Sequence, residues 1–298
     1  MKQQTKANFA LLMVAMVWGA SFVISKDTLN HLQTFNFLAI RFILSGVLCS
    51  ILFYKNMKTL TKQTFFHGVI IGTVLFMAFA LWAYGLNFTT ASKSGFIIGF
   101  AVVIVPVLSA IMLKKKPSRA AVLGVIIAMV GLAMLSLDGH TALQKGDLYT
   151  LAAAFMFALH IITIDQFTLT ADSFALAIVQ ISVVGVFSLI LTLIWETPVI
   201  PIDVQVWTNL GLLIILSTAF AYIVLNHMQK FTSPTHTALI FTTEPVFAGL
   251  FAFLLIGETL PLQGIIGCIL ILSGMVISEL NWKKLLSKKG KKKAPSAA

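Results

Sequence analysis

Apolar residues follow one another in long, nearly uninterrupted runs along this chain, and polar residues gather in the short segments between the runs. Ten runs are about 20 residues long, enough for a helix to cross the roughly 30 Å hydrocarbon core of a bilayer. Each run therefore predicts a transmembrane helix. The ten predicted spans are 8–26, 33–54, 65–86, 92–113, 118–137, 147–166, 173–195, 206–228, 235–256 and 262–281.

The basic residues between the runs predict the orientation, because Lys and Arg are enriched in cytoplasmic loops. With the N-terminus inside, 17 of the 21 Lys and Arg residues fall on the cytoplasmic side. Three fall on the other side, Lys26, Lys93 and Lys145, and Arg41 lies within a span. Both termini are therefore expected in the cytoplasm. We expect a multi-pass protein of the cell (plasma) membrane, of the bacterial inner-membrane kind.

The composition excludes the common soluble classes. Of the 298 residues, 58% are hydrophobic and 10% are charged, and the mean hydropathy is +0.96. A soluble domain is about half apolar and about a quarter charged, so an ordinary soluble enzyme and a disordered chain are both excluded. A transmembrane β-barrel would need short alternating segments instead of continuous apolar runs.

The net charge of +11 does not indicate a nucleic-acid partner, because seven of the lysines follow Trp282. The segment 283–298 is predicted to be a basic cytoplasmic tail that attracts anionic membrane lipid. The two cysteines, Cys49 and Cys268, each lie inside an apolar run and are expected to be small buried hydrophobes. Neither a metal nor a cofactor is expected.

The two halves of the chain resemble each other at a constant offset of 139 residues. The matched pairs are 18–22 with 157–161, Arg41 with Gln180, 86–87 with 225–226, and Pro106 with Pro245. After the prolines the offset is 143, which matches Gly124 with Gly267 and Gly131 with Gly274. The match predicts two repeats, 1–140 and 141–282. It also indicates that the first span is retained and is not a cleaved signal peptide.

Each predicted repeat holds five spans, and because five is odd the second repeat enters the membrane from the opposite side. Inverted repeats are typical of secondary transporters, in which a central site opens first to one face and then to the other. The predicted fold is an all-α membrane protein of ten transmembrane helices, arranged as two inverted five-helix repeats around a central cavity. A chain that holds both repeats is expected to act as a monomer.

Several short motifs occur in a defined order along the chain. They are Trp18-Gly19, Arg41-Phe42, the 90–96 run leading to Pro106, Gly124 with Gly131, Glu244-Pro245-Val246, Gly257-Glu258 and Gly267 with Gly274. In order and spacing they resemble the drug/metabolite transporter superfamily, in its ten-span branch with two EamA domains. The resemblance covers the chain except for the lysine tail. The chain departs from the family pattern at one place. Where the second half has Gly257-Glu258, the first half has the run 114–117, which is three lysines and a proline and holds no acidic residue.

The resemblance implies ten helices around a central cavity between the halves. It also implies secondary transport of small organic solutes, often outward and often of amino acids or related metabolites. Any role of the acidic residue Glu258 cannot be carried over to the first half, because the first half has no acidic residue at that position.

Two charged residues lie in the middle of predicted spans, where an unpaired charge is costly and must face protein or water. Arg41 is interpreted either as a group that recognises a substrate carboxylate or acts in gating, or as one half of a structural ion pair. Glu244 is interpreted either as a protonation site that couples transport to protons, because burial favours its neutral form, or as a structural partner of Arg41 or a backbone amide. Pro106 and Pro245 each remove a helical hydrogen bond and predict helix breaks.

Aromatic and polar residues at helical spacing predict the lining of the cavity. Polar residues in lipid-spanning helices point inward, and small-solute sites are mostly apolar with a few polar groups. The predicted substrate-binding or cavity-lining residues are Trp18, Phe22, Arg41, Trp82, Tyr84, Phe96, His160, Gln180, Tyr222, Asn226 and Phe241. Packing or an interfacial belt is the alternative for the aromatic residues, and a structural hydrogen bond is the alternative for His160.

Four glycines predict close packing of two spans. Gly124 and Gly131, like Gly267 and Gly274, are seven residues apart and therefore lie on one helix face. They allow the backbones of the fifth and tenth spans to approach closely.

The function classes can now be weighed. A phosphate-binding loop, paired catalytic acids and a nucleophile motif are all missing from the sequence, which argues against an ATP-driven pump and against an enzyme. The sequence predicts a secondary transporter of a small-molecule substrate, an exporter of metabolites such as amino acids. An importer or facilitator of a vitamin-like or nitrogenous solute would show the same features. A channel and a membrane enzyme are weaker alternatives.

Overall fold

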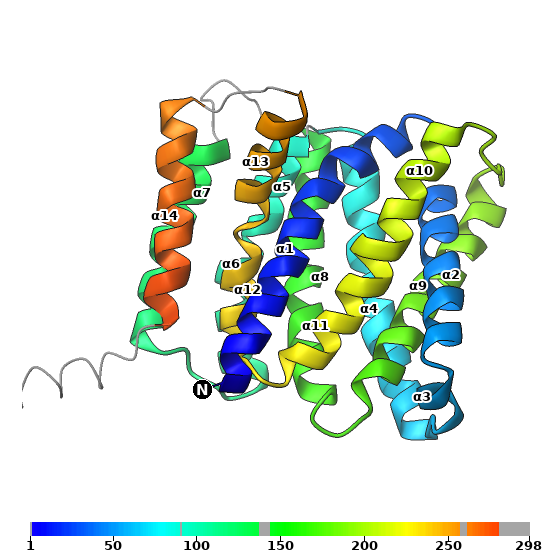
Figure 1. Ribbon diagram of the computed structural model, residues 1–298, viewed down its shortest axis with the longest axis horizontal. Helices are drawn as coiled ribbons and strands as arrows, with labels where there is room; N and C mark the ends of the chain where they lie inside the picture. Colours follow the sequence, from blue (N-terminus) through cyan, green and yellow to red (C-terminus); the bar gives the residue numbers. More distant parts are fainter. Residues whose placement is uncertain (1, 90, 137–143, 257–260, 280–298) are drawn as a thin grey trace, which may run out of the picture.

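The computed structural model describes residues 2–89, 91–136, 144–256 and 261–279, and the regular structure in these ranges is helical. The long helices stand side by side and run in alternating directions (Figure 1). We call the face that holds Lys2 and α3 the N-terminal face, and the other end of the helices the opposite face. The helices are α1 (Lys2–Leu29), α2 (Thr34–Leu52), α3 (Tyr54–Lys58), α4 (Lys62–Leu86), α5 (Ala91–Gly99), α6 (Ala101–Met112), α7 (Arg119–Ser136), α8 (Lys145–Phe167), α9 (Ser173–Trp195), α10 (Val204–Leu212), the π-helix η1 (Leu213–Phe220), α11 (Ala221–Gln229), α12 (Pro234–Phe241), α13 (Glu244–Ile256) and α14 (Leu262–Glu279).

Every predicted span lies over helical structure. By length and apolar composition, six helical segments are able to cross a membrane. They are Gln3–Leu29, Thr34–Leu52, Lys62–Leu86, Lys145–Phe167, Ser173–Trp195 and Val204–Gln229. Shorter apolar helices cover Ile97–Met112, Arg119–Met134 and Leu262–Ser278. The protein is therefore an all-α, multi-pass membrane protein.

Two of the predicted spans are broken, although not at the prolines themselves. The fourth is interrupted at Phe100, and Pro106 lies inside α6. The ninth is interrupted at Thr242 and Thr243, and Pro245 lies in the first turn of α13. Both interruptions thus lie a few residues before the prolines that the sequence singled out. A proline disturbs the carbonyl four residues before it, so the chain bends on the N-terminal side of the ring.

The carbonyl groups exposed by the second break are satisfied locally. The Thr242 hydroxyl donates to the Leu239 carbonyl at 2.6 Å, and the Thr243 hydroxyl donates to the Ile240 carbonyl at 2.6 Å. Such back-bonding allows a helix to be interrupted at membrane depth without leaving backbone groups unpaired. The break can therefore persist in the interior, and Glu244 begins the helix that follows it.

The eighth predicted span contains a feature that the hydrophobic pattern did not predict. Its middle, Leu213–Phe220, is a π-helix that joins α10 to α11. A π-helix has a wider turn than an α-helix and is often found at functional sites. Figure 1 shows this segment crossing beside α1.

Polar contacts at the two faces tie distant helices together. On the opposite face the Glu196 carboxylate accepts from the N–H groups of Phe35 (3.0 Å) and Asn36 (2.7 Å), which are free donors in the first turn of α2. On the N-terminal face Lys115 Nζ lies 2.6 Å from Asp165 Oδ2. This ion pair joins the α6–α7 connection in the first half of the chain to α8 in the second half.

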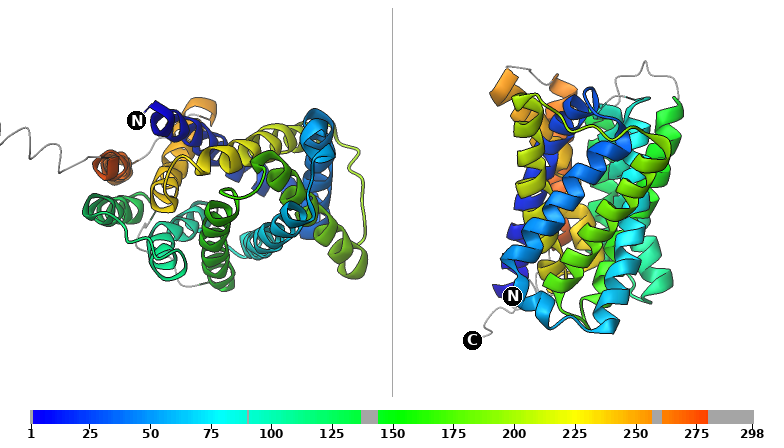
Figure 2. Two further views of the ribbon diagram at one scale, coloured as in Figure 1. Left: turned by 90° about the horizontal axis from the view of Figure 1, so that it is seen from below. Right: turned by 90° about the vertical axis from the view of Figure 1, so that its right-hand side faces the viewer.

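Helices α7 and α14 pack through the predicted glycines. A Cβ atom on Gly124 would lie 2.5 Å from the carbonyl oxygen of Gly274, and one on Gly131 would lie 2.6 Å from the carbonyl oxygen of Gly267. These distances leave no room for a side chain, so the two backbones are in direct contact. Figure 2 shows α7 and α14 together at one edge of the molecule, away from α2 and α9.

We expect Gly274→Ala to destabilise the protein, because the new Cβ would meet the Gly124 carbonyl oxygen at 2.5 Å. Overpacking of this kind costs about 1–3 kcal/mol. The measurement is the apparent unfolding temperature of the purified protein in detergent. Gly211→Ala is the matched control, because nothing lies within 4 Å of a Cβ there. Equal unfolding temperatures for the two variants would contradict the packing argument.

Candidate functional site

A cavity of about 280 Å³ lies between helices from both halves of the chain. Its walls come from α1, α2, α4, α5, α6, α8, α11, α12 and α13, and most of them are apolar or aromatic. Toward the N-terminal face it is closed by the buried side chains of Tyr222, Leu225 and Ala238. Toward the opposite face its lining reaches Val23, whose side chain is 57% exposed. The lining therefore extends from Val23 to the level of Tyr222, Leu225 and Ala238.

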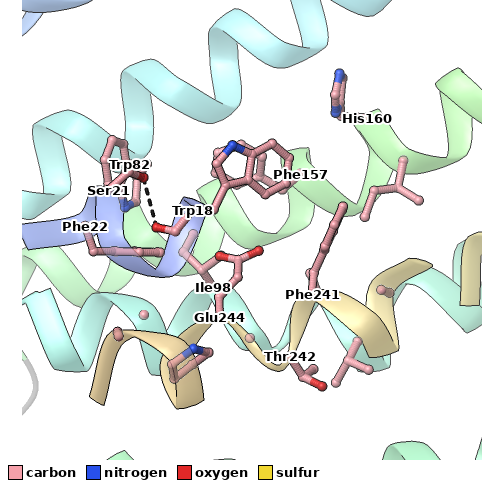
Figure 3. Close-up of a pocket in the computed structure, with 18 of the residues that line it drawn as sticks. Trp18, Ser21, Phe22, Trp82, Ile98, Phe157, His160, Phe241, Thr242 and Glu244 are labelled. Atoms are coloured by element: carbon pink, nitrogen blue, oxygen red, sulfur yellow. Dashed lines mark hydrogen bonds between the residues drawn. The ribbon is translucent and has the colours of Figure 1, made fainter. Parts of the chain in front are cut away.

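Aromatic rings form much of the wall. The ring of Trp18 lies 4.9 Å from that of Phe241 and 5.5 Å from that of Tyr222, centroid to centroid. Phe22 and Trp82 meet edge to face at 5.8 Å. These separations are in the range of favourable aromatic pairs. Rings from α1, α4, α11 and α12 thus hold one another in fixed positions around the cavity, and Figure 3 shows several of them together.

Arg41 of α2 is 2% exposed and lines the cavity. Its Nε donates to Thr218 Oγ1 at 2.8 Å, and its Nη2 donates to Ser217 Oγ at 3.0 Å. Its guanidinium carbon lies 5.3 Å from the ring centroid of Phe42 and 5.2 Å from that of Phe79. Among the residues that the structure describes, Arg41 meets no carboxylate within ion-pair distance. The interpretation of Arg41 as one half of a structural ion pair is therefore wrong for the described part of the chain.

Glu244 begins α13 directly after the helix break and lines the same cavity. Its side chain projects into the cavity between Trp18 and Phe241 (Figure 3). Within the described ranges its carboxylate forms neither a hydrogen bond nor an ion pair. The interpretation of Glu244 as a partner of Arg41 or of a backbone amide is thus also wrong. The interpretation as a protonation site remains a prediction.

Among the residues that the structure describes, two buried hydrogen-bond donors of cavity-lining side chains have no partner. They are Nη1 of Arg41 and Nε1 of Trp82, and both side chains are at most 5% exposed. Buried polar groups are usually paired, so each unpaired group needs an explanation. The indole of Trp18 differs, because its Nε1 donates to the Ser217 carbonyl at 2.8 Å. Two buried donors without a partner, and one carboxylate, thus belong to residues that line the cavity.

His160 reaches the cavity from α8, and its Nε2 lies 2.7 Å from Gln180 Oε1. Gln180 is fully buried and stands behind the histidine, outside the cavity lining. One ring nitrogen of His160 thus makes a structural hydrogen bond, which was the alternative to solute contact. The ring itself still forms part of the cavity wall. Its centroid lies 5.9 Å from that of Tyr222.

The structure gathers most of the predicted residues at one cavity. Eight of the predicted residues line it: Trp18, Phe22, Arg41, Trp82, His160, Tyr222, Phe241 and Glu244. Pro245 lines it as well. The prediction for Phe96 concerns a side chain outside the described part of the chain.

Three predicted lining residues do not line this cavity. Tyr84 is 41% exposed and packs on Phe88 and Tyr149 near the opposite face. Asn226 is fully buried and donates to the Tyr222 carbonyl at 2.8 Å, one turn beyond the cavity. Gln180 is the third, for the reason given above. A polar stripe identifies the side of a helix that faces inward, but it does not give the level of the cavity along that side. Tyr84 and Asn226 lie above or below this level, and Gln180 lies behind the cavity wall.

The cavity also contains residues that the sequence did not single out, including Phe79, Phe157 and Ser21. Phe79 and Phe157 lie one helical turn before Trp82 and His160, so the helical period could have found them. The described ranges hold no group of three His, Cys, Asp or Glu side chains suited to a metal ion.

Known proteins resemble this one over nearly the whole chain. The model of the EamA-like transporter family matches residues 5–137 and 144–280. An uncharacterized transporter of Archaeoglobus fulgidus is 29% identical over 274 residues, which cover 92% of this chain and 86% of the relative. A probable amino-acid metabolite efflux pump of Salmonella typhimurium is 24% identical over 291 residues, which cover 93% and 96%. A crystal structure with 15% identity shares the fold with a TM-score of 0.79, over 94% of this chain and 99% of that one.

We expect Glu244→Gln to unfold at a temperature no lower than the unchanged protein, because the substitution neutralises a carboxylate that has no partner. The matched control is Asp165→Asn, which removes a paired and almost fully buried carboxylate and should lower the unfolding temperature. Both are measured by thermal unfolding in detergent. A loss of stability in Glu244→Gln as large as that in Asp165→Asn would show that Glu244 has a structural partner.

Proposed function

The chain belongs to the EamA-like transporter family, and from this premise we propose that it exports amino acids or related small metabolites across the plasma membrane by alternating access. As a member of this family it is a transporter and not an enzyme. The observation that carries the proposal is a single cavity lined by a cation and a carboxylate, Arg41 and Glu244, which do not pair with each other and form no ion pair with any other described residue.

The proposed architecture is ten spans in two inverted repeats, 1–140 and 141–282, with both termini in the cytoplasm. The alternating directions of the helices support it, because an odd number of spans per repeat inverts the second one. In this orientation the N-terminal face is cytoplasmic and the basic segment 283–298 meets anionic lipid there. One chain supplies both repeats, so we propose that the monomer is the working unit.

Matched positions of the two repeats differ in exposure, which supports alternating access. Asn87 and its counterpart Asn226 occupy equivalent places near opposite ends of the fold. Asn87 is exposed, whereas Asn226 is fully buried and its Oδ1 has no hydrogen-bond partner. In an inverted repeat the two positions exchange environments when the transporter changes state. The structure fits a state that is closed toward the cytoplasm.

A cross-repeat contact supports the same assignment. Asp165 pairs with Lys115 on the cytoplasmic face and joins the two repeats. The residue at the matched position of the first repeat, Lys26, lies on the opposite face and donates to the Leu86 carbonyl at 2.6 Å. The ion pair is therefore present on the side at which the cavity is closed.

The proposed substrate class follows from the charges and the walls. A carboxylate would compensate Arg41, and an ammonium group or other donor would complement Glu244. The aromatic walls suit an apolar body, and a volume of about 280 Å³ limits the solute to roughly amino-acid size. The printed name of the Salmonella relative, a probable amino-acid metabolite efflux pump, supports the class and the outward direction.

We expect saturable counterflow of one or more labelled amino acids in proteoliposomes that contain the purified protein. Arg41→Gln should reduce exchange of carboxylate-bearing solutes about tenfold or more, because a hydrogen bond to a charged group contributes about 1.5–3 kcal/mol. Arg119→Gln is the matched control, since Arg119 is exposed and is the other arginine of the chain. Glu244→Gln should abolish acceleration by a proton gradient, and undiminished proton dependence would remove the coupling role.

Other outcomes would replace the proposal. Flux that does not saturate and shows no counterflow would indicate a channel. Net accumulation in the direction of the cytoplasm would indicate an importer of a nitrogenous or vitamin-like solute. Chemical conversion of the solute would indicate an enzyme.

Cysteine labelling tests alternating access directly, in a background where Cys49 and Cys268 are replaced by alanine. We expect Asn87→Cys to react with a membrane-impermeant maleimide from outside, and Asn226→Cys to be protected. Adding Asp165→Asn should raise the labelling rate of Asn226→Cys from the cytoplasmic side several-fold, because it releases the contact between the repeats. Labelling of Asn226→Cys that is unaffected by Asp165→Asn would argue against this closure.

A further inference from the structure

The π-helix η1 is the structural element that holds Arg41. Ser217 and Thr218 lie inside it and are both almost fully buried. Their hydroxyl groups accept from Nη2 and Nε of Arg41, at 3.0 and 2.8 Å. A third contact lies between the same two helices. The Ser45 hydroxyl of α2 donates to the Arg41 carbonyl at 2.7 Å and shares this proton with the Ile214 carbonyl of η1, which lies 3.1 Å from Ser45 Oγ.

The same segment also anchors the aromatic wall. The Ser217 carbonyl accepts from Trp18 Nε1 at 2.8 Å, so one residue contacts α1 through its backbone and α2 through its side chain. In a regular α-helix this carbonyl would be committed to the N–H four residues later. In a π-helix the corresponding donor is the N–H five residues later, and the second lone pair of the carbonyl can still accept from an outside donor such as this indole.

The partners of Arg41 are unusual because they are neutral. A buried cation is ordinarily paired with an anion, since its desolvation is costly. Here two hydroxyl groups and the faces of Phe42 and Phe79 surround the guanidinium, and Nη1 has no partner within the described ranges. Hydroxyl acceptors fix the direction of the guanidinium plane without cancelling its charge. The charge and one pair of N–H donors thus remain for a group that enters from the cavity.

We propose that Ser217 and Thr218 are positioning residues that keep Arg41 an uncompensated cation, with Nη1 reserved for an anionic group of the solute. This inference rests on the proposed function in one respect, which is that the cavity is the site at which the solute binds. The ligand chemistry that it specifies is a carboxylate or a similar small oxyanion. A fixed acidic residue in place of either hydroxyl would satisfy Arg41 permanently and remove the need for an anion in the solute.

The test uses acetate as the anionic probe and acetamide as its neutral counterpart, and it does not require transport. A ligand that binds only the folded state stabilises it by RT ln(1 + [L]/Kd), so the unfolding temperature rises with ligand concentration once that concentration exceeds the Kd. We expect acetate, and not acetamide, to raise the apparent unfolding temperature of the detergent-solubilised protein. Arg41→Gln measures any effect of salt alone and should remove the difference between the two probes.

The variants separate positioning from simple structural support. Thr218→Val removes one acceptor while keeping the shape, and should raise the acetate concentration needed for a given rise in unfolding temperature about two- to tenfold. Thr218→Ser keeps a hydroxyl and should restore the affinity of the unchanged protein. Ser217→Asp supplies an internal anion and should abolish the acetate effect. Ser217→Ala serves as the second acceptor deletion if Thr218→Val does not fold.

The outcomes are distinct. Equal acetate affinity in Thr218→Val and Thr218→Ser, or a full acetate effect in Ser217→Asp, would overturn the positioning role. An intact acetate effect together with no exchange of any amino acid would instead count against the proposed function and leave the positioning role standing. Stabilisation by acetate that survives Arg41→Gln would show that the anion binds elsewhere, which would also overturn the proposal.

Discussion

The interior of a membrane contains no water to pair with polar groups, and this constraint accounts for much of the structure. Where the ninth span breaks, Thr242 and Thr243 return hydrogen bonds to the carbonyls of the preceding turn. Where the eighth span widens into a π-helix, the Ser217 carbonyl takes the indole N–H of Trp18. The irregular backbone is thus satisfied from within, so the polar groups left unpaired at the cavity stand out as candidates for binding.

The two repeats share a framework but not a charge pattern. Arg41 of the first repeat corresponds to Gln180 of the second, and Gln180 contacts His160 behind the cavity wall. The unpaired carboxylate, Glu244, has Val105 at the matched position of the first repeat. In the proposed alternating access the two halves would exchange conformations, while the asymmetric substitutions place one cation and one acid in a single cavity. A symmetric motion can then act on an asymmetric solute.

Much of the helical framework could be predicted from the sequence, because apolar runs of membrane length allow few alternatives. The charged and aromatic residues of the cavity could be predicted too, since Arg41 and Glu244 are costly in lipid. The position of a residue along its helix, relative to the cavity, could not be predicted. Tyr84 and Asn226 belong to polar stripes that face inward, but both lie beyond the ends of the cavity. The π-helix could not be predicted either. Its contacts with α1 and α2 come from residues far away in sequence, and no local pattern in 213–220 encodes them.

The separation of Arg41 from Glu244 argues that this site is built for a ligand and not for stability. Two opposite charges in one low-dielectric cavity would be stabilised by direct contact, and a purely structural pair would make that contact. Here hydroxyl groups on one rigid turn hold the cation, and a helix start after a break holds the acid. Each charge is kept from the other by the backbone that carries it. Under the proposed transport function, a solute that bears both an acidic and a basic group satisfies both, and its release leaves them unpaired again.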